Sequence, residues 1–276
     1  MKTNNLLIRS LIFCLLSIVS STIFCQEKIR KNDFQPEEGM EGKNVVWVPT
    51  PQILVEKMLQ LAKITPKDYL IDLGSGDGRM VITAAKFGTR ALGIEYNPDF
   101  VKLSEKNAKK EGVTDMAHFI EADLYEFDFS KATVISMFLL HEINLKLRPK
   151  LLDLKPGTRI VSNTFTMQEW QYDEVAKTSG GSNRWDTAYL WIIPAKVEGK
   201  WILPQGGELI LNQEFQMLTG SMIVGNNKLT ITEGKLRGNE ITFNAGGTIY
   251  AGLVNGSKIE GTFTSGGITK TWSATR

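Results

Sequence analysis

One glycine-rich turn constrains the fold of this chain more than any other segment. The turn, Asp72–Arg79, follows the short apolar run Tyr69–Leu73 and precedes Arg79–Phe87, where apolar residues recur at helical spacing. Glycines allow positive φ angles and let a ligand approach the backbone closely. The first turn of a helix adds free N–H groups and a partial positive charge. A strand, such a turn and a helix in this order predict an α/β domain with a ligand site at the strand end.

The spacing of the glycines separates two classes of ligand. The turn reads G-x-G-x-G, whereas a dinucleotide-binding turn reads G-x-G-x-x-G and would need glycine in place of Arg79. Asp72 precedes the first glycine and Asp77 lies within the turn. Their negative charge disfavours a pyrophosphate and suits the amino group and sulfonium of S-adenosylmethionine (SAM). We therefore predict SAM as the cofactor, with a nicotinamide-dependent oxidoreductase as the disfavoured alternative.

Two further carboxylates lie at the ends of the next two predicted strands. Glu95 comes about twenty residues after the turn, where an acidic residue binds ribose hydroxyls in nucleotide-binding α/β folds. Asp123 could accept a hydrogen bond from an adenine amino group, with Leu124 against the ring. Each acid alone could be structural, but acids at three successive strand ends together favour SAM binding.

Strands and helices alternate through the first part of the chain. The predicted strands are Tyr69–Leu73, Arg90–Tyr96, Ala117–Ala122, Ala132–Leu139, Thr158–Asn163 and Ala188–Ile193. Helices are expected from Pro51, at Arg79–Phe87, at Pro98–Gly112 and at Leu145–Leu154, with Thr50 as the N-cap of the first. Strands separated by helices predict a parallel, doubly wound Rossmann-like sheet covered on both faces. We assign residues 47–196 to this domain.

The pattern changes in residues 197–276, where no helical periodicity remains. Short alternating runs are separated by turn signals such as Gly225–Asn227 and Asn255-Gly256. This pattern predicts a C-terminal antiparallel all-β domain, either a small barrel or a curved sheet. Its residues do not decide between binding a partner and covering an edge of the main sheet.

Residues 1–25 resemble an export signal. Lys2 and Arg9 precede a mostly apolar run at 11–24, and polar sequence begins at Gln26. We expect an exported protein, periplasmic or secreted, with a linker at 26–46. The alternative is an uncleaved N-terminal anchor in a membrane, although the apolar run is shorter than a comfortable span of about 20 residues.

Removal of residues 1–25 would change the chemistry available to the chain. Cys14 and Cys25, the two cysteines of the sequence, both lie in this segment, so disulfides and cysteine zinc sites are not expected afterwards. With two histidines in the chain, we recognise no metal cluster. The formal charge of +2 falls to zero without Lys2 and Arg9, which gives no electrostatic case for a nucleic-acid partner.

Three segments carry a resemblance to a known family: Val48–Pro51, Asp72–Arg79 and Gly93–Asn97. Residues 48–193 resemble the class I SAM-dependent methyltransferases. The segments are similar to a bacterial and mitochondrial group that includes protein-lysine methyltransferases such as the enzyme that modifies the membrane ring of ATP synthase. The resemblance implies cofactor contacts at Asp72, Gly74, Gly76, Glu95 and Asp123, with Thr50 and Pro51 bordering the pocket. We add the neighbouring positions Ser75, Gly78, Tyr96, Asn97, Leu124 and Phe138 to the expected cofactor site.

Methyl transfer requires a positioned nucleophile that has lost its proton. His141 could take a proton from the acceptor, Glu142 could orient an amine, and Asn163 could line the acceptor site. Each could equally have a supporting or surface role. By resemblance we expect a protein lysine as the acceptor, and a small molecule is the alternative. A further alternative is an exported SAM-binding protein without turnover, because SAM is made in the cytoplasm.

Overall fold

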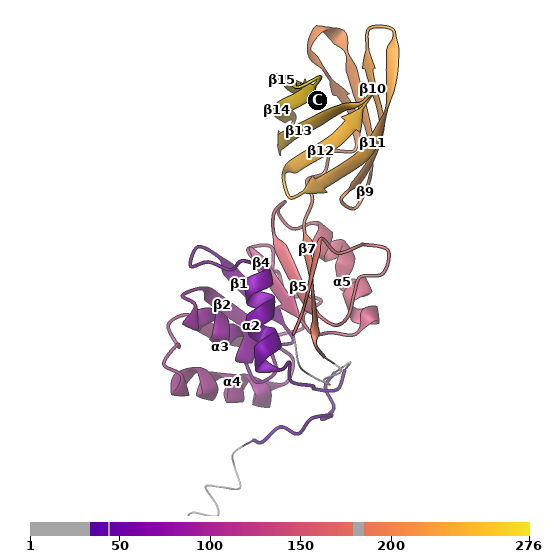
Figure 1. The fold of residues 1–276 in the computed structure, drawn as a ribbon. Coiled ribbons are helices and arrows are strands. Elements are labelled where there is room, and N and C mark those ends of the chain that lie inside the picture. The colour runs from indigo at the N-terminus through magenta and orange to yellow at the C-terminus, as the bar shows by residue number, and fades with distance from the viewer. Residues whose placement is uncertain (1–33, 44, 179–184) are drawn as a thin grey trace, which may run out of the picture. The chain divides into compact units, whose positions relative to one another are not determined.

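The computed structural model describes residues 34–43, 45–178 and 185–276 (Figure 1). The predicted export signal, with Cys14 and Cys25, lies outside these residues, as does part of the predicted linker. The chain divides after Glu37, and every helix and strand named below belongs to Glu38–Arg276. Within the described residues, the helices are too short or too polar for any of them to cross a bilayer.

A seven-stranded mixed sheet has the strand order β3-β2-β1-β4-β5-β7-β6. Strands β1 to β5 run parallel, whereas β7 is antiparallel to both β5 and β6. The strands are β1 (Tyr69–Leu73), β2 (Arg90–Glu95), β3 (Ala117–Glu121), β4 (Val134–Met137), β5 (Arg159–Asn163), β6 (Glu174–Lys177) and β7 (Thr187–Ile192). The order places the carboxyl ends of β1, β2, β3 and β4 along one edge, where α/β folds bind their ligands.

The expectation of an entirely parallel sheet is wrong at the β7–β6 end. A parallel connection needs a crossover, usually a helix, and within the described residues no helix lies between β5 and β7. The sequence does not predict strand β6, because its residues alternate only between half-buried and exposed positions and include charged side chains at both ends. The doubly wound α/β class is confirmed by the five parallel strands and the helices that join them.

Helices cover both faces of this sheet (Figure 1). They are α2 (Gln52–Leu61), α3 (Arg79–Lys86), α4 (Pro98–Lys110) and α5 (His141–Leu152). Successive strand residues point to opposite faces. Leu70 therefore packs in the cluster that includes the apolar residues of α2 and α3, and Ile71 packs in the cluster that includes those of α5.

Two predicted helix starts are wrong. The N-cap of α2 is Pro51 and not Thr50, and the Thr50 hydroxyl instead accepts a hydrogen bond from Asn163 Nδ2 at 3.2 Å. Helix α5 begins at His141, four positions before the predicted Leu145. The sequence does not signal this start, because Leu140 makes no side-chain cap and a buried polar residue, Asn144, interrupts the apolar spacing.

The C-terminal part is a closed antiparallel barrel, which resolves the choice between a barrel and a curved sheet. Its strands are β8 (Gly199–Ile202), β9 (Glu208–Glu214), β10 (Met217–Val224), β11 (Asn227–Arg237), β12 (Glu240–Ala245), β13 (Thr248–Asn255), β14 (Lys258–Ser265) and β15 (Ile268–Thr275), with a 3-10 turn at Pro204–Gly206. The sequence pattern does not reveal β8. This strand pairs with β9 and, through Ile202 opposite Thr275, with β15, which closes the barrel. Trp201, Phe243 and Trp272 help to fill its interior.

Candidate cofactor site and acceptor side

The glycine-rich turn joins β1 to α3 at the edge of the sheet. Gly74, Gly76 and Gly78 have φ values of 79°, 51° and 82°, in the left-handed region that side chains disfavour. The Gly74 and Ser75 N–H groups both donate to the Ile94 carbonyl of β2, at 2.9 and 3.0 Å. A Cβ at Gly76 would lie 2.4 Å from Nε1 of Trp47. The turn is therefore held against β2 and leaves its backbone close to a neighbouring aromatic side chain.

Arg79 fastens this turn to the segment before α2. Its guanidinium donates to both oxygens of Asp77, with Nη2 to Oδ2 at 2.5 Å, and Nη1 donates to the Thr50 carbonyl at 2.8 Å. Asn107 Nδ2 of α4 donates to the Asp77 carbonyl at 3.0 Å. The position that a dinucleotide-binding turn would give to glycine is thus occupied by a side chain that fixes the loop.

Asp72 lies near the end of β1 with its side chain buried. Its Oδ1 accepts a hydrogen bond from Ser136 Oγ of β4 at 2.7 Å. Burial raises the pKa of the Asp72 carboxyl from 3.8 to about 7, a rise that the Ser136 hydrogen bond opposes and that Glu95 and Asp77 support. Such a group releases its proton readily when a cation arrives beside it.

Glu95 is the last residue of β2, and both of its carboxylate oxygens accept backbone hydrogen bonds. Oε2 accepts from the Gly76 N–H at 2.9 Å, and Oε1 accepts from the Asn97 N–H at 3.0 Å. The carboxylate is therefore held in one orientation between the glycine-rich turn and the start of α4. Each oxygen retains a lone pair that can accept from a ligand hydroxyl.

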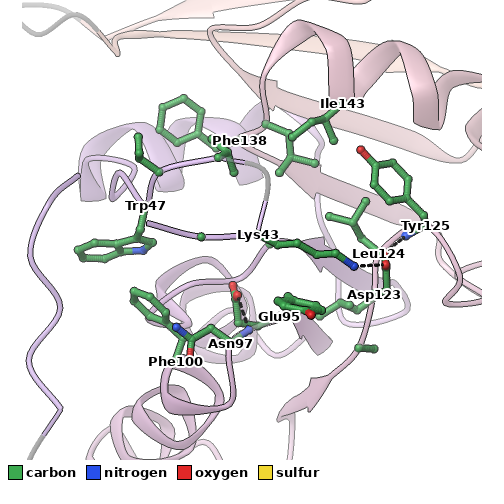
Figure 2. Close-up of a pocket in the computed structure, with 18 of the residues that line it drawn as sticks. Lys43, Trp47, Glu95, Asn97, Phe100, Asp123, Leu124, Tyr125, Phe138 and Ile143 are labelled. Atoms are coloured by element: carbon green, nitrogen blue, oxygen red, sulfur yellow. Dashed lines mark hydrogen bonds and ion pairs between the residues drawn. The ribbon is translucent and has the colours of Figure 1, made fainter. Parts of the chain in front are cut away.

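A cavity lies over the ends of β2, β3 and β4 (Figure 2). The predicted cofactor positions in its lining are Gly74, Glu95, Tyr96, Asn97, Asp123, Leu124 and Phe138. The lining residues that the sequence analysis does not assign to this site are Gly42, Lys43, Val45, Val46, Trp47, Val48, Ile94, Phe100, Ala122, Tyr125, Leu139 and Ile143. The space inside it, counted together with the open solvent at its mouth, is about 800 Å³. Four of its lining residues, Gly42, Lys43, Val45 and Val46, fall in the segment predicted as a linker.

Lys43 reaches across this cavity to Asp123 (Figure 2). Its Nζ donates to Asp123 Oδ2 at 2.7 Å and lies 4.3 Å from the centre of the Tyr96 ring. This hydrogen bond raises the pKa of Lys43 and lowers the pKa of Asp123. The second oxygen of Asp123 accepts from the Tyr125 N–H at 2.8 Å. Lys43 is thus bound to the carboxylate that we predict as the acceptor for an adenine amino group. The two residues are 80 positions apart, so no local sequence pattern predicts this pair.

A second, smaller cavity adjoins the first on the side of β1. Its lining includes the predicted positions Thr50, Asp72, Ser75 and Gly76, together with Asp77 and Arg79. Three residues line both cavities: Trp47, Gly74 and Phe138. Pro51 and Gly78 line neither, although Gly78 N–H closes the turn by donating to the Ser75 carbonyl at 2.9 Å.

The two cavities fit the two halves of SAM. One offers apolar walls and the carboxylates of Glu95 and Asp123 to a nucleoside, and the other offers Asp72 to an ammonium group. Within the described residues, the buried hydroxyl of Ser75 has no hydrogen-bond partner, as expected where a ligand supplies one. When bound, SAM would supply a methyl group activated on a sulfonium, and Trp47, Gly74 and Phe138, which line both cavities, would lie nearest to it.

The three candidate catalytic residues, His141, Glu142 and Asn163, lie apart from the cavity linings. His141 Nδ1 lies 3.0 Å from the Thr166 carbonyl, which requires a proton on Nδ1, and its ring meets Phe165 edge-on. Glu142 is exposed in the first turn of α5. Asn163 is buried and donates to Thr50. In the described chain, no group of three or more His, Cys, Asp or Glu side chains could hold a metal ion.

Comparison with known proteins identifies the family. The model of the ANTKMT methyltransferase domain matches residues 72–174, from Asp72 to the first residue of β6. A protein-lysine N-methyltransferase of Saccharolobus islandicus is 44% identical over 153 residues, which are 54% of this chain and 94% of that protein. The chain belongs to the ANTKMT methyltransferase family. It is a SAM-dependent methyltransferase, which confirms the predicted cofactor and reaction class.

Other relatives also match about half of this chain. A methyltransferase of Salinibacter ruber, described as an RNA methyltransferase and solved with S-adenosylhomocysteine (SAH), is 47% identical with a TM-score of 0.51. It matches 54% of this chain and 96% of its own. The mouse adenine nucleotide translocase lysine N-methyltransferase is 35% identical over 47% of this chain, and the match spans 56% of the mouse protein. The family model ends at residue 174 and so does not include the barrel of this methyltransferase.

Proposed function

We propose that this methyltransferase transfers the methyl group of SAM to lysine side chains of a protein. The observation that carries the proposal is the charge of the two cavities. Their lining includes two cations in the described residues, Lys43 and Arg79, and each is held by a carboxylate, Asp123 and Asp77 respectively. Among the described lining residues, no cation is therefore left to bind the phosphates of a nucleic acid, which provide most of its affinity for proteins.

Carboxylates follow His141 and Trp185 in the sequence, as Glu142 and Asp186, and a cation, Arg184, precedes Trp185. A carboxylate attracts a lysine ammonium and repels a phosphate backbone. Lysine must lose its proton before it reacts, because only the neutral amine carries the lone pair that attacks the methyl group.

The reaction forms one bond and breaks one. The lone pair of the lysine nitrogen forms the N–C bond while the C–S bond breaks, and sulfur keeps that electron pair as SAH leaves. The methylated ammonium can then release a proton to water, which prepares it for another transfer. Phe138 and the glycine-rich turn position the reacting atoms, and positioning is the main requirement of such a displacement.

The names of the relatives support two different acceptors. The Saccharolobus and mouse proteins are named for lysine, and the Salinibacter protein is named for RNA. Methyl-labelled SAM should be incubated with the purified protein and, in separate reactions, with protein and RNA extracts. We expect label in protease-sensitive material and methyl-lysine in its hydrolysate. Label confined to nuclease-sensitive material would overturn the lysine proposal. The variant Glu95→Gln should lower transfer to any acceptor.

We also propose that residues 1–25 direct export, with a membrane anchor as the alternative. The support is the positive start at Lys2 and Arg9 followed by the apolar run. Intact-mass measurement of the protein expressed with its native N-terminus should give a chain that starts near Gln26. A full-length mass in the membrane fraction would favour the anchor, and a full-length mass in the soluble cytoplasm would contradict both.

A further inference from the structure

Three aromatic rings and one imidazole form a continuous cluster beside the junction of the two cavities. The centre of the Phe138 ring lies 6.0 Å from that of Phe165 and 5.2 Å from that of Trp185. Phe165 and Trp185 are 5.9 Å apart, and the His141 ring lies 5.7 Å from Phe165. These residues come from four separate places: the end of β4, the start of α5, the loop after β5 and the segment before β7. We call Phe138, Phe165 and Trp185 the aromatic wall.

The aromatic wall begins where the methyl group of SAM is expected. Phe138 lines both the nucleoside-sized cavity and the smaller one, so its ring borders the point at which the two halves of SAM join. Its labelled position in Figure 2 is above Trp47, on the side of the cavity away from Asp123. Phe165 and Trp185 extend the same apolar surface away from both cavities, because they contact Phe138 but line neither cavity.

The loop that carries Phe165 is fixed in an unfavourable backbone conformation. Thr164 has a φ of 60°, which is rare for a β-branched residue and is tolerated where the surroundings determine it. The Phe165 carbonyl accepts from Ser162 Oγ at 2.8 Å and from Asn144 Nδ2 at 3.3 Å. The Thr166 carbonyl accepts from His141 Nδ1. His141 is therefore a positioning residue for this loop.

We propose that the aromatic wall binds the side chain of the acceptor lysine and holds its cationic forms by cation–π contact. This inference rests on the proposed lysine methylation. The ring centres lie 5–6 Å apart, so the rings pack on one another and leave no room for an ammonium between them. The acceptor side chain would lie along the outer side of this cluster. Ring faces attract ammonium groups without requiring N–H donors. A methylated lysine, with fewer N–H groups, is therefore held as well as an unmethylated one, and repeated methylation of one lysine follows.

Two carboxylates lie next to wall residues or to His141 in the sequence. Asp186 lies next to Trp185 in the sequence and is half-buried, with Oδ1 accepting from Thr187 Oγ1 at 2.7 Å. Glu142 lies next to His141 and is exposed. A nucleobase could also stack on such rings, so the choice of lysine follows from the proposed function.

The test compares peptide binding and turnover in Phe165→Leu and Trp185→Leu with the parent. Each change removes a π face and keeps an apolar side chain, although of smaller volume. The Michaelis constant for a lysine peptide should rise about 3- to 30-fold, the range of a cation–π contact, and products should carry fewer methyl groups by mass spectrometry. Phe165→Tyr should restore both values. SAH affinity should stay within about twofold, because neither residue lines a cavity.

A charge-specific binding measurement separates cation–π contact from simple packing. In the presence of SAH, a peptide with trimethyl-lysine should bind the parent more tightly than the same peptide with the neutral tert-butyl isostere. This preference should disappear in Phe165→Leu and Trp185→Leu. It should persist in the control Phe263→Leu, which removes a ring stacked at 5.3 Å on Tyr250 in the barrel.

The outcomes distinguish the two proposals. Lysine methylation by the parent with unchanged kinetics and unchanged charge preference in both wall variants would overturn the aromatic wall alone. A parent enzyme that labels RNA and not lysine would overturn the lysine function, and the wall proposal with it. A loss of SAH binding in the wall variants would show that the rings support the cofactor site, and this too would overturn the proposal.

Discussion

Asp72 should make cofactor binding depend on pH near neutrality. Its buried carboxyl has a pKa raised to about 7, chiefly by burial. The smaller cavity offers this carboxyl to the amino group of SAM or SAH, and an ammonium is held by the ionised form. Below the pKa the site must first lose a proton, so the apparent affinity falls by the fraction that is ionised.

The magnitude follows from the ionised fraction. With a pKa of about 7, roughly one tenth of the Asp72 carboxyls are ionised at pH 6 and roughly nine tenths at pH 8. The dissociation constant of SAH should therefore fall about tenfold between pH 6 and pH 8, or about 1.4 kcal/mol. Binding at pH 6.5 should also release a proton, which calorimetry detects in buffers of different ionisation enthalpy.

The control is Asp72→Asn, which keeps the hydrogen bond from Ser136 and has no titration. The variant should bind SAH weakly, with little change between pH 6 and pH 8. A flat profile in the parent, or the same slope in Asp72→Asn, would refute the assignment of Asp72 to the ammonium.

The same pKa predicts that the stability of the fold falls as pH rises, whereas SAH binding strengthens. Folded Asp72 holds its proton up to about pH 7, whereas the unfolded residue loses it near 3.8, so the folded state binds more protons between these values and stability falls as pH rises through them. The full effect is on the order of 4 kcal/mol as an upper limit. Asp72→Asn should therefore melt at a higher temperature than the parent at pH 8, and the difference should vanish near pH 4. Replacing this one carboxyl with an amide should thus raise the stability of the fold at pH 8 and weaken SAH binding.

Two further changes examine the walls of the cofactor site. Gly76→Ala places a Cβ 2.4 Å from the Trp47 ring at a φ of 51°, so it should lower the melting temperature and weaken SAH binding. The control is Gly112→Ala, where φ is 68° and open space surrounds the position. This change should cost only the backbone strain of about 1–2 kcal/mol and leave SAH binding unchanged. Equal effects of the two changes on binding would contradict the close approach of Trp47. Lys43→Met frees the Asp123 carboxylate for an adenine amino group, so SAH should bind a few-fold more tightly and with less dependence on salt. Weaker binding by this variant in titration calorimetry would mean that Lys43 contacts the cofactor.

The local parts of the cofactor site were predictable from the sequence. The positive φ values of the turn require glycine, and those glycines are spaced within a few residues of Asp72. Glu95 follows the turn by one helix and one strand, so the parallel pairing of β1 with β2 places its carboxylate beside Gly76. Local backbone requirements and one strand pairing were enough to bring these residues together.

The remainder depends on contacts between distant segments. Lys43 reaches Asp123, and Trp47 packs on Phe100 with ring centres 5.1 Å apart. Lys43 and Trp47 both come from a stretch with no helical or strand periodicity. The antiparallel end of the sheet is hard to predict for a similar reason, because β6 is a half-exposed edge strand whose pattern is too short to recognise. Polar linkers and edge strands gain their structure from what they cover, and that information is not local.

The same distinction separates the two sides of the active site. The cofactor side uses a turn, a strand end and their mutual pairing, so it is specified by a compact set of residues around Asp72 and Glu95. The acceptor side is assembled from Phe138, Phe165 and Trp185, each on a different connection at the edge of the sheet. Substitutions in those connections can alter the acceptor without disturbing the hydrogen bonds of the cofactor side. Two relatives at 44% and 47% identity are named for different acceptors, lysine and RNA. Such a difference is expected when the acceptor is determined by connections outside the glycine-rich turn. For this chain, the Phe165→Leu and Trp185→Leu variants test whether the aromatic wall determines the acceptor.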